Sequence, residues 1–210
     1  RSSKITGSVT VSSADGVSLR FLEAGSIVAT NSDDVLVADN AGRANFGVTV
    51  SGGSNAQILH NQFGTGGQGV RLTGSTAGPL VAHNRIDVAN TGLDIDSLAG
   101  VVTNVTVRDN YISGGLRGVD LVGNATGRIE HNRITAGTTA LAVNFSYVGT
   151  LDIAGNDIFG ATTGVLYNAA AALHDNRIFD HSTGVSSTVV AVGGALGFAP
   201  NSGGNDIFDN

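Results

Sequence analysis

Apolar and polar residues alternate in short runs along most of the chain, and turn-forming residues separate the runs. Alternating apolar positions in the N-terminal part are Ile5, Val9, Val11, Val17, Leu19, Val35 and Val37. Strict alternation predicts half-buried β-strands. An amphipathic helix needs about 10–12 residues of helical periodicity, and no segment offers this. The pattern therefore predicts an all-β protein built from many short strands.

A second pattern is superimposed on this alternation, because an asparagine recurs with Ile or Phe two positions after it. The steps between successive copies are 20 to 29 residues, and the asparagines are Asn61, Asn84, Asn110, Asn132, Asn156, Asn176 and Asn205. Self-similarity at this period is typical of a solenoid. Asp39 and Asn40 resemble a worn copy of the same motif.

The residues between two copies fit three short strands per coil. After Asn84 the predicted strands are residues 85–87, 93–96 and 105–108, and residues 97–104 are a predicted loop. Coils of this kind, stacked on one another, give three parallel sheets around a narrow core. We expect about 8–9 coils, counting one for each motif copy together with the N-terminal runs. The unbroken repeat predicts one domain over residues 1–210, with diverged coils in 1–45 and regular coils in 46–210.

The recurring asparagine has a physical role in such a fold. The chain must turn sharply between two strands, and Asn tolerates the left-handed backbone region better than most residues. Its side-chain amide can also bond to the same amide in the next coil, ~4.8 Å away. We therefore expect the seven asparagines to form a ladder.

The repeats resemble those of the pectin-lyase-like superfamily, whose fold is a right-handed, single-stranded parallel β-helix. The resemblance covers residues 46–210 well and 1–45 loosely. It implies an extracellular or bacterial cell-surface location and a polysaccharide or cell-surface glycan as partner. The superfamily includes polysaccharide lyases, hydrolases, epimerases, tailspikes and structural modules of surface proteins. The Gly-His-Gly and Arg-Ile-Lys motifs of polygalacturonases and the Asp-Pro-His-Glu motif of epimerases are missing.

Composition narrows the function classes further. The chain of 210 residues has no Cys and no Met, a net charge of −6, and Lys4 as its sole lysine. Thiol chemistry and disulfides are excluded, and no dense basic patch for nucleic acid is present. No run of 18 apolar residues predicts a membrane span, and no signal peptide is visible. Because the chain begins at Arg1 and parallel coils expose strand edges, we expect continuation in a longer chain or end-to-end self-association.

The candidate chemistry lies on the outward positions of the predicted second strands. Asp94 and Asp120 should occupy adjacent coils ~4.8 Å apart, Asp96 shares their face, Arg71 lies one coil before, and Arg117 is close in sequence. Two such carboxylates suit a retaining glycosidase, and three suit Ca²⁺. They also suit a surface acidic patch with arginine counter-ions, and no aromatic platform for sugar stacking accompanies them in the sequence.

Histidines form a second column before the ladder positions. His60, His83 and His131 each precede a ladder asparagine, and Asp109 takes this place in the coil between. Stacked imidazoles suit a transition metal or acid–base chemistry. The same pattern arises where the turn requires a polar residue or Gly, and Gly155 and Gly204 also fill this place.

These observations favour a structural or adhesive extracellular β-helix module of a bacterial surface or secreted protein, without catalysis. The alternative is a carbohydrate-active enzyme, a lyase or a hydrolase, or a glycan-binding module, that uses the Asp94, Asp96 and Asp120 face. No cofactor is expected on the first hypothesis, and Ca²⁺ is the one considered on the second.

Overall fold

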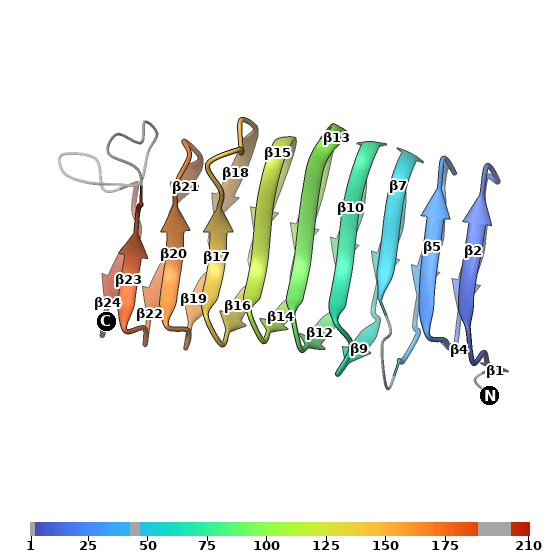
Figure 1. Ribbon diagram of the computed structural model, residues 1–210, viewed down its shortest axis with the longest axis horizontal. Helices are drawn as coiled ribbons and strands as arrows, with labels where there is room; N and C mark the ends of the chain where they lie inside the picture. The colour runs from blue at the N-terminus through green and yellow to red at the C-terminus, as the bar shows by residue number, and fades with distance from the viewer. Residues whose placement is uncertain (1–2, 43–46, 189–202) are drawn as a thin grey trace.

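The computed structural model describes residues 3–42, 47–188 and 203–210, and these residues form 24 strands and no helix. All strand pairings between them are parallel. Figure 1 shows the strands stacked coil on coil along the long axis of the molecule, with the two termini at opposite ends. The prediction of an all-β parallel solenoid is confirmed, with about eight turns.

One sheet begins directly after the recurring asparagines. Its seven strands pair in chain order, because each is the same part of successive coils. They are β9 (Gln62–Gly64), β12 (Arg85–Val88), β14 (Tyr111–Gly114), β16 (Arg133–Ala136), β19 (Asp157–Phe159), β22 (Arg177–Phe179) and β24 (Asp206–Phe208).

A second sheet of fifteen strands contains two faces of the solenoid. The front face, nearest the viewer in Figure 1, comprises β2 (Ser8–Ser12), β5 (Ser26–Thr30), β7 (Val48–Ser54), β10 (Gln68–Ala77), β13 (Thr91–Arg108), β15 (Arg117–Glu130), β17 (Thr139–Val143), β20 (Thr163–Tyr167) and β23 (Thr183–Ser186). The strands behind are β3 (Ser18–Arg20), β6 (Leu36–Ala38), β8 (Gln57–Leu59), β11 (Leu80–Ala82), β18 (Thr150–Ala154) and β21 (Ala172–His174). A small third sheet pairs β1 (Ser3–Lys4) with β4 (Leu22–Glu23).

The two faces join because β13 and β15 continue around the corner between them. The predicted loop at residues 97–104 is wrong, since these residues lie within the unbroken β13. The register with β15 shifts between Ser97 and Val101 and again between Val102 and Val105, as at β-bulges, which absorb extra residues and bend a strand. Ser97 and Val102 are buried, so this corner is part of the packed structure.

Apolar side chains stack in rows inside the solenoid, and the alternation of the sequence decides which ones. One row follows the strands that precede the ladder: Ile58, Val81, Val107, Ile129, Ile153 and Leu173. A second row follows the strands after it: Phe63, Ile86, Ile112, Ile134, Ile158 and Ile178. Both rows are almost fully buried. Each aliphatic side chain removed from water in this way stabilises the fold by about 1.5–3 kcal/mol.

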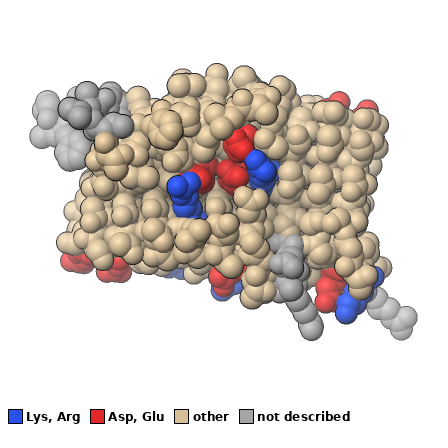
Figure 2. Space-filling view, viewed as in Figure 1, with Lys and Arg blue, Asp and Glu red and all other residues tan. Residues whose placement is uncertain are grey.

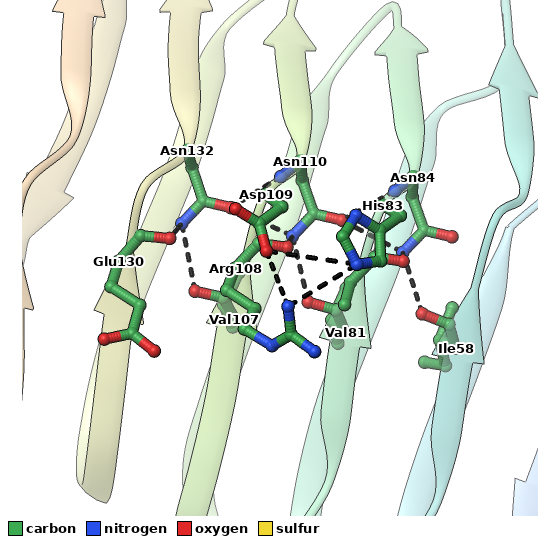
Figure 3. A network of polar contacts seen from close by, with 11 residues as sticks. Ile58, Val81, His83, Asn84, Val107, Arg108, Asp109, Asn110, Glu130 and Asn132 are labelled. Atoms are coloured by element: carbon green, nitrogen blue, oxygen red, sulfur yellow. Dashed lines mark hydrogen bonds and ion pairs between the residues drawn. The ribbon is translucent and has the colours of Figure 1, made fainter.

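The seven asparagines form one continuous column, and Asn40 extends it by one coil. From Asn40 to Asn176, each side-chain Nδ2 and each backbone N–H donates to Oδ1 of the asparagine in the next coil, at 2.9–3.0 Å. Figure 3 shows the central part of the column, where Nδ2 also donates to backbone carbonyls of its own coil and the preceding coil. The ladder therefore satisfies backbone N–H groups buried at the turn, which would otherwise be costly.

The left-handed residue of this turn is the one before each asparagine, and our prediction that the asparagine itself adopts this conformation is wrong. Positive φ angles of 53–65° occur at His60, His83, Asp109, His131, Gly155, Asp175 and, at 68°, Gly204. Gly has no steric penalty there, and Asp and His are enriched among the other residues that adopt it. This requirement explains why His, Asp and Gly share one place in successive coils.

Candidate functional site

The predicted site residues meet on the front face of three consecutive coils. Arg71 from β10 pairs in register with Asp94 from β13, and Asp94 pairs with Asp120 from β15. Asp96 follows on β13, and Arg117 begins β15. Figure 2 shows these acidic side chains in a shallow hollow between the two arginines. We refer to these five residues as the charged cluster.

Each carboxylate of the charged cluster has an arginine beside it. Arg71 Nε lies 3.4 Å from Asp94 Oδ2, and the same guanidinium bonds to Asp96. Arg117 bonds to Asp120. The side chains of Asp94 and Asp120 are only 13% and 12% exposed. The arginines are thus the counter-ions that the sequence suggests, but the two aligned carboxylates are largely withdrawn from water.

Two neutral side chains complete the charged cluster and were missed in the sequence. Gln68 Nε2 lies 3.5 Å from Asp94 Oδ2, and Asn144 Nδ2 donates to Asp120 Oδ1. A signal for Asn144 was present, because it is the next outward position after Ala142, which aligns with Asp120. Both oxygens of Asp120 therefore have donors within the protein.

Crowding of acids in this hollow changes the proton affinity of Asp94. Its pKa is raised from 3.8 to about 6, first by burial and then by the nearby Asp120, and Arg71 partly opposes both effects. Perturbed carboxyl groups of this kind occur in active sites and also in structural ion-pair networks. Asp94 can therefore hold a proton at mildly acidic pH.

The histidine column lies along the edge where the ladder turns. The rings of His60 and His83 stack with centroids 5.0 Å apart. His83 Nε2 lies 3.9 Å from Asp109 Oδ2 and 3.4 Å from an Arg108 nitrogen, and that arginine pairs with Asp109 at 2.6 Å (Figure 3). Because the turn needs a left-handed residue here, the column is explained by backbone conformation.

His174, the last residue of β21, is paired with carboxylates and does not stack on another imidazole ring in the way that His60 and His83 do. Its Nδ1 lies 2.7 Å from Asp175 Oδ2, and its Nε2 lies 2.6 Å from Asp152 Oδ1 in the preceding coil. The hydrogen bond to Asp175 and, to a smaller extent, the one to Asp152 raise the pKa of His174 above 6.5. In its charged form the imidazolium ties two coils together.

The sequence of the C-terminal coils is similar to that of a known protein family. A family model described as "Periplasmic copper-binding protein (NosD)" matches residues 100–210, more than half of the chain. The chain belongs to the NosD family. The NosD match spans the coils from the middle of β13 to β24, and the family is described as periplasmic, which agrees with an extracellular or periplasmic location. No curated protein and no solved structure matches the chain.

Within the described ranges, no helix is long and apolar enough to cross a membrane.

The copper in the NosD family description can be tested against the donors of this chain. Copper favours imidazole, thiolate and thioether ligands, and the chain has five His, no Cys and no Met. The segments outside the described ranges contain no His, Asp or Glu. Among the described residues, no three His, Asp or Glu side chains are grouped so as to hold a metal ion. The residues present do not fit a copper centre, and the same finding gives no support for Ca²⁺ at Asp94, Asp96 and Asp120.

The two remaining histidines support this conclusion. Both ring nitrogens of His174 are within hydrogen-bonding distance of carboxylates. His181 is buried, with Nδ1 3.1 Å from the Ala161 N–H and Nε2 3.0 Å from the Ile158 carbonyl. Among the described residues, neither imidazole belongs to a group of three side chains that could hold a metal ion.

Proposed function

We propose that this chain is a non-catalytic scaffold of the cell envelope or the extracellular space, which presents an adhesive surface on a rigid solenoid. The observation that carries the proposal is the internal pairing of the charged cluster. Asp120 has donors on both oxygens, and Arg71 joins Asp94 to Asp96. A general base or nucleophile must be within reach of its substrate, whereas these carboxylates are engaged with the protein.

The copper named in the family description is not part of this proposal. That description applies to the family, and in the part of the chain that the structure describes no three His, Asp or Glu side chains are grouped so as to hold a metal ion. The proposed function therefore assigns no metal to the solenoid.

One observation favours a second candidate, a carbohydrate-active site or glycan-binding surface at the charged cluster. Asp94 and Asp120 are register partners on adjacent strands, and burial raises the pKa of Asp94 to about 6. A retaining glycosidase uses two carboxyl groups ~5 Å apart, one of them protonated as the acid. The limited exposure of both side chains makes this the weaker hypothesis.

Assays of the wild-type chain and of two conservative variants separate the candidates. Acidic and neutral polysaccharides are incubated with the wild type, Asp94→Asn and Asp120→Asn, with and without Ca²⁺. We expect no turnover in any sample. Turnover that either substitution abolishes would establish the enzyme hypothesis and end the scaffold proposal.

Thermal unfolding supplies a metal readout that does not depend on activity. A ligand that binds the native state raises the melting temperature. We expect Ca²⁺ and Cu²⁺, each added alone in moderate excess, to leave the melting temperature unchanged. A rise with Cu²⁺ that His83→Asn removes would contradict our reading of the histidine column.

A further inference from the structure

The exposed apolar side chains of the molecule are concentrated beside the charged cluster. Large hydrophobic residues usually lie inside, and those that gather on a surface often mark an interaction site. Five of the seven exposed ones in the described residues lie in three consecutive coils, and four of these follow the front-face positions of the first and third coils. They are Leu98, Val101, Phe145 and Val148, with exposed fractions of 69%, 39%, 78% and 71%. We call these four residues the apolar ridge.

Backbone pairing brings the members of the apolar ridge together although they are up to 50 positions apart in sequence. Gly123 belongs to the coil between them. On one side its backbone is packed so closely that an added Cβ would meet the Leu98 nitrogen. On the other side, the Val148 N–H donates to the Gly123 carbonyl at 2.9 Å. Leu98 and Val148 therefore flank Gly123 on its two sides, with only a glycine backbone between them.

The neighbouring coils carry small residues at the same level. Gly100 packs against Gly74 and Ser75 of the preceding coil. In the following coil, Asn168 bonds to the strand end before Phe145 and leads into a run of alanines. Small residues therefore lie beside the coils that carry the ridge.

The charged cluster borders the ridge directly. Asp96 Oδ1 accepts a hydrogen bond from the Leu98 N–H at 3.3 Å, and Asn144, which precedes Phe145, bonds to Asp120. Three carboxylates and two guanidinium groups give the cluster a net charge of −1 when all are ionised. A partner that contacts the ridge would gain by bringing one positive charge.

We propose that the apolar ridge and the charged cluster together form a docking surface for a polypeptide segment that carries large apolar side chains and a nearby Lys or Arg. The inference rests on the proposed function, because it gives the scaffold the surface through which it holds a partner. Three of the four ridge side chains are aliphatic and offer sugar hydroxyls no hydrogen bonds. Apolar anchors within a polar rim are typical of protein interfaces.

The test uses a random peptide library displayed on phage, selected on the immobilised wild-type chain. We expect enriched peptides to combine aromatic or aliphatic residues with Lys or Arg. Their synthetic versions should bind Phe145→Ser and Leu98→Ser at least about tenfold more weakly, as at interface hot spots. Phe21→Ser is the matched control, since Phe21 is 57% exposed but lies in the N-terminal coils, and should bind like the wild type.

A second arm tests the electrostatic half of the proposal. Asp96→Asn should weaken binding of a cationic peptide by a few fold and reduce its salt dependence. Leu98, Phe145 and Phe21 are exposed and Asp96 is half-buried, so unchanged melting temperatures confirm that the variants fold.

Several outcomes would overturn the docking surface. They are failure to enrich any peptide, enrichment of acidic peptides, and equal binding by Phe145→Ser. Concentration-dependent dimerisation that Phe145→Ser abolishes would assign the ridge to a second copy of the chain. Glycan binding that the same variant abolishes would assign it to a sugar. None of these outcomes depends on turnover, so the docking surface and the non-catalytic scaffold can fail separately.

Discussion

The asparagine ladder and the charged cluster are both stacks of polar side chains in successive coils, but they are stabilised in opposite ways. In the ladder, identical neutral amides repeat from Asn40 to Asn176 with almost no exposure. Each amide donates to the next coil and accepts from the preceding one. In the cluster, Asp94 and Asp120 also stand in register, yet carboxylates accept only and repel each other.

The comparison shows what a stacked position requires. A group with both a donor and an acceptor can repeat without limit, because each copy satisfies the next. A charged group cannot repeat without counter-ions, and here Arg71 and Arg117 supply them. The raised pKa of Asp94 is the remaining cost of placing like charges together in a partly buried site.

The largest effect is expected from removing a central rung. Asn110→Ala deletes an amide that donates to Val81, Arg108 and Asn132 and accepts two bonds from Asn84. Because the abandoned groups are buried, we expect a loss of about 3–5 kcal/mol in the free energy of unfolding. Urea denaturation measures it.

A matched substitution sharpens this test. Asn124→Ala changes an exposed asparagine and should cost less than about 0.5 kcal/mol. Asn110→Asp introduces the chemistry of the charged cluster into the ladder without a counter-ion, so it should destabilise strongly at pH 7 and less in acid. Equal stability of Asn110→Ala and Asn124→Ala would refute the energetic role of the ladder.

A smaller loss is expected when a counter-ion of the charged cluster is removed. Arg117→Met keeps the aliphatic stem but leaves Asp120 with Asn144 alone, so the free energy of unfolding should fall by about 2 kcal/mol. Arg20→Met is the control, because its pair with Asp39 is longer, 4.0 Å, and more exposed, and its loss should be below about 0.5 kcal/mol. Thermal unfolding at pH 7 compares them; similar losses would mean that the cluster is an ordinary surface pair.

Asp94→Asn should increase stability, since it removes a charge that the fold disfavours. The native pKa of about 6 lies above 3.8, so between these values the native state holds the extra proton and stability falls as pH rises. The variant should gain about 1 kcal/mol at pH 7–8, allowing for solvent screening, and nothing near pH 3.5. Melting temperatures across this range measure the gain, and a destabilised variant at pH 8 would show that the Arg71 pair dominates.

The smallest effect concerns His174, where a cation is shared by two carboxylates. Its native pKa is raised above 6.5, so its contribution is complete below pH 6.5 and disappears as pH rises through the native pKa. His174→Gln should therefore lower the melting temperature slightly at pH 5.5–6 and leave it unchanged near pH 9. A loss that is the same at both pH values would indicate packing instead of charge.

The sequence predicted the fold well because both of its periods are consequences of local geometry. Alternation selects inward side chains on a strand, and the recurrence of Asn with Ile or Phe marks the same corner of each coil. It predicted the alignment of Asp94 with Asp120 for the same reason. The left-handed conformation was assigned to the asparagine, but the residue before it adopts this conformation. His, Asp and Gly fill that position, and because their side chains differ chemically, the sequence does not show that they share a backbone conformation.

The sequence by itself determined that coils stack, which residues point inward, and that no thiol or thioether is available. Only the tertiary structure decided how the corner at residues 97–104 is built, how deeply Asp94 and Asp120 are withdrawn from water, and that Leu98 and Val148 flank Gly123 on its two sides. These features depend on register shifts and on side chains from neighbouring coils. The pattern of apolar and polar residues does not show how deeply a side chain is buried against a neighbouring coil. That depth depends on the number of extra residues at the corner of each coil.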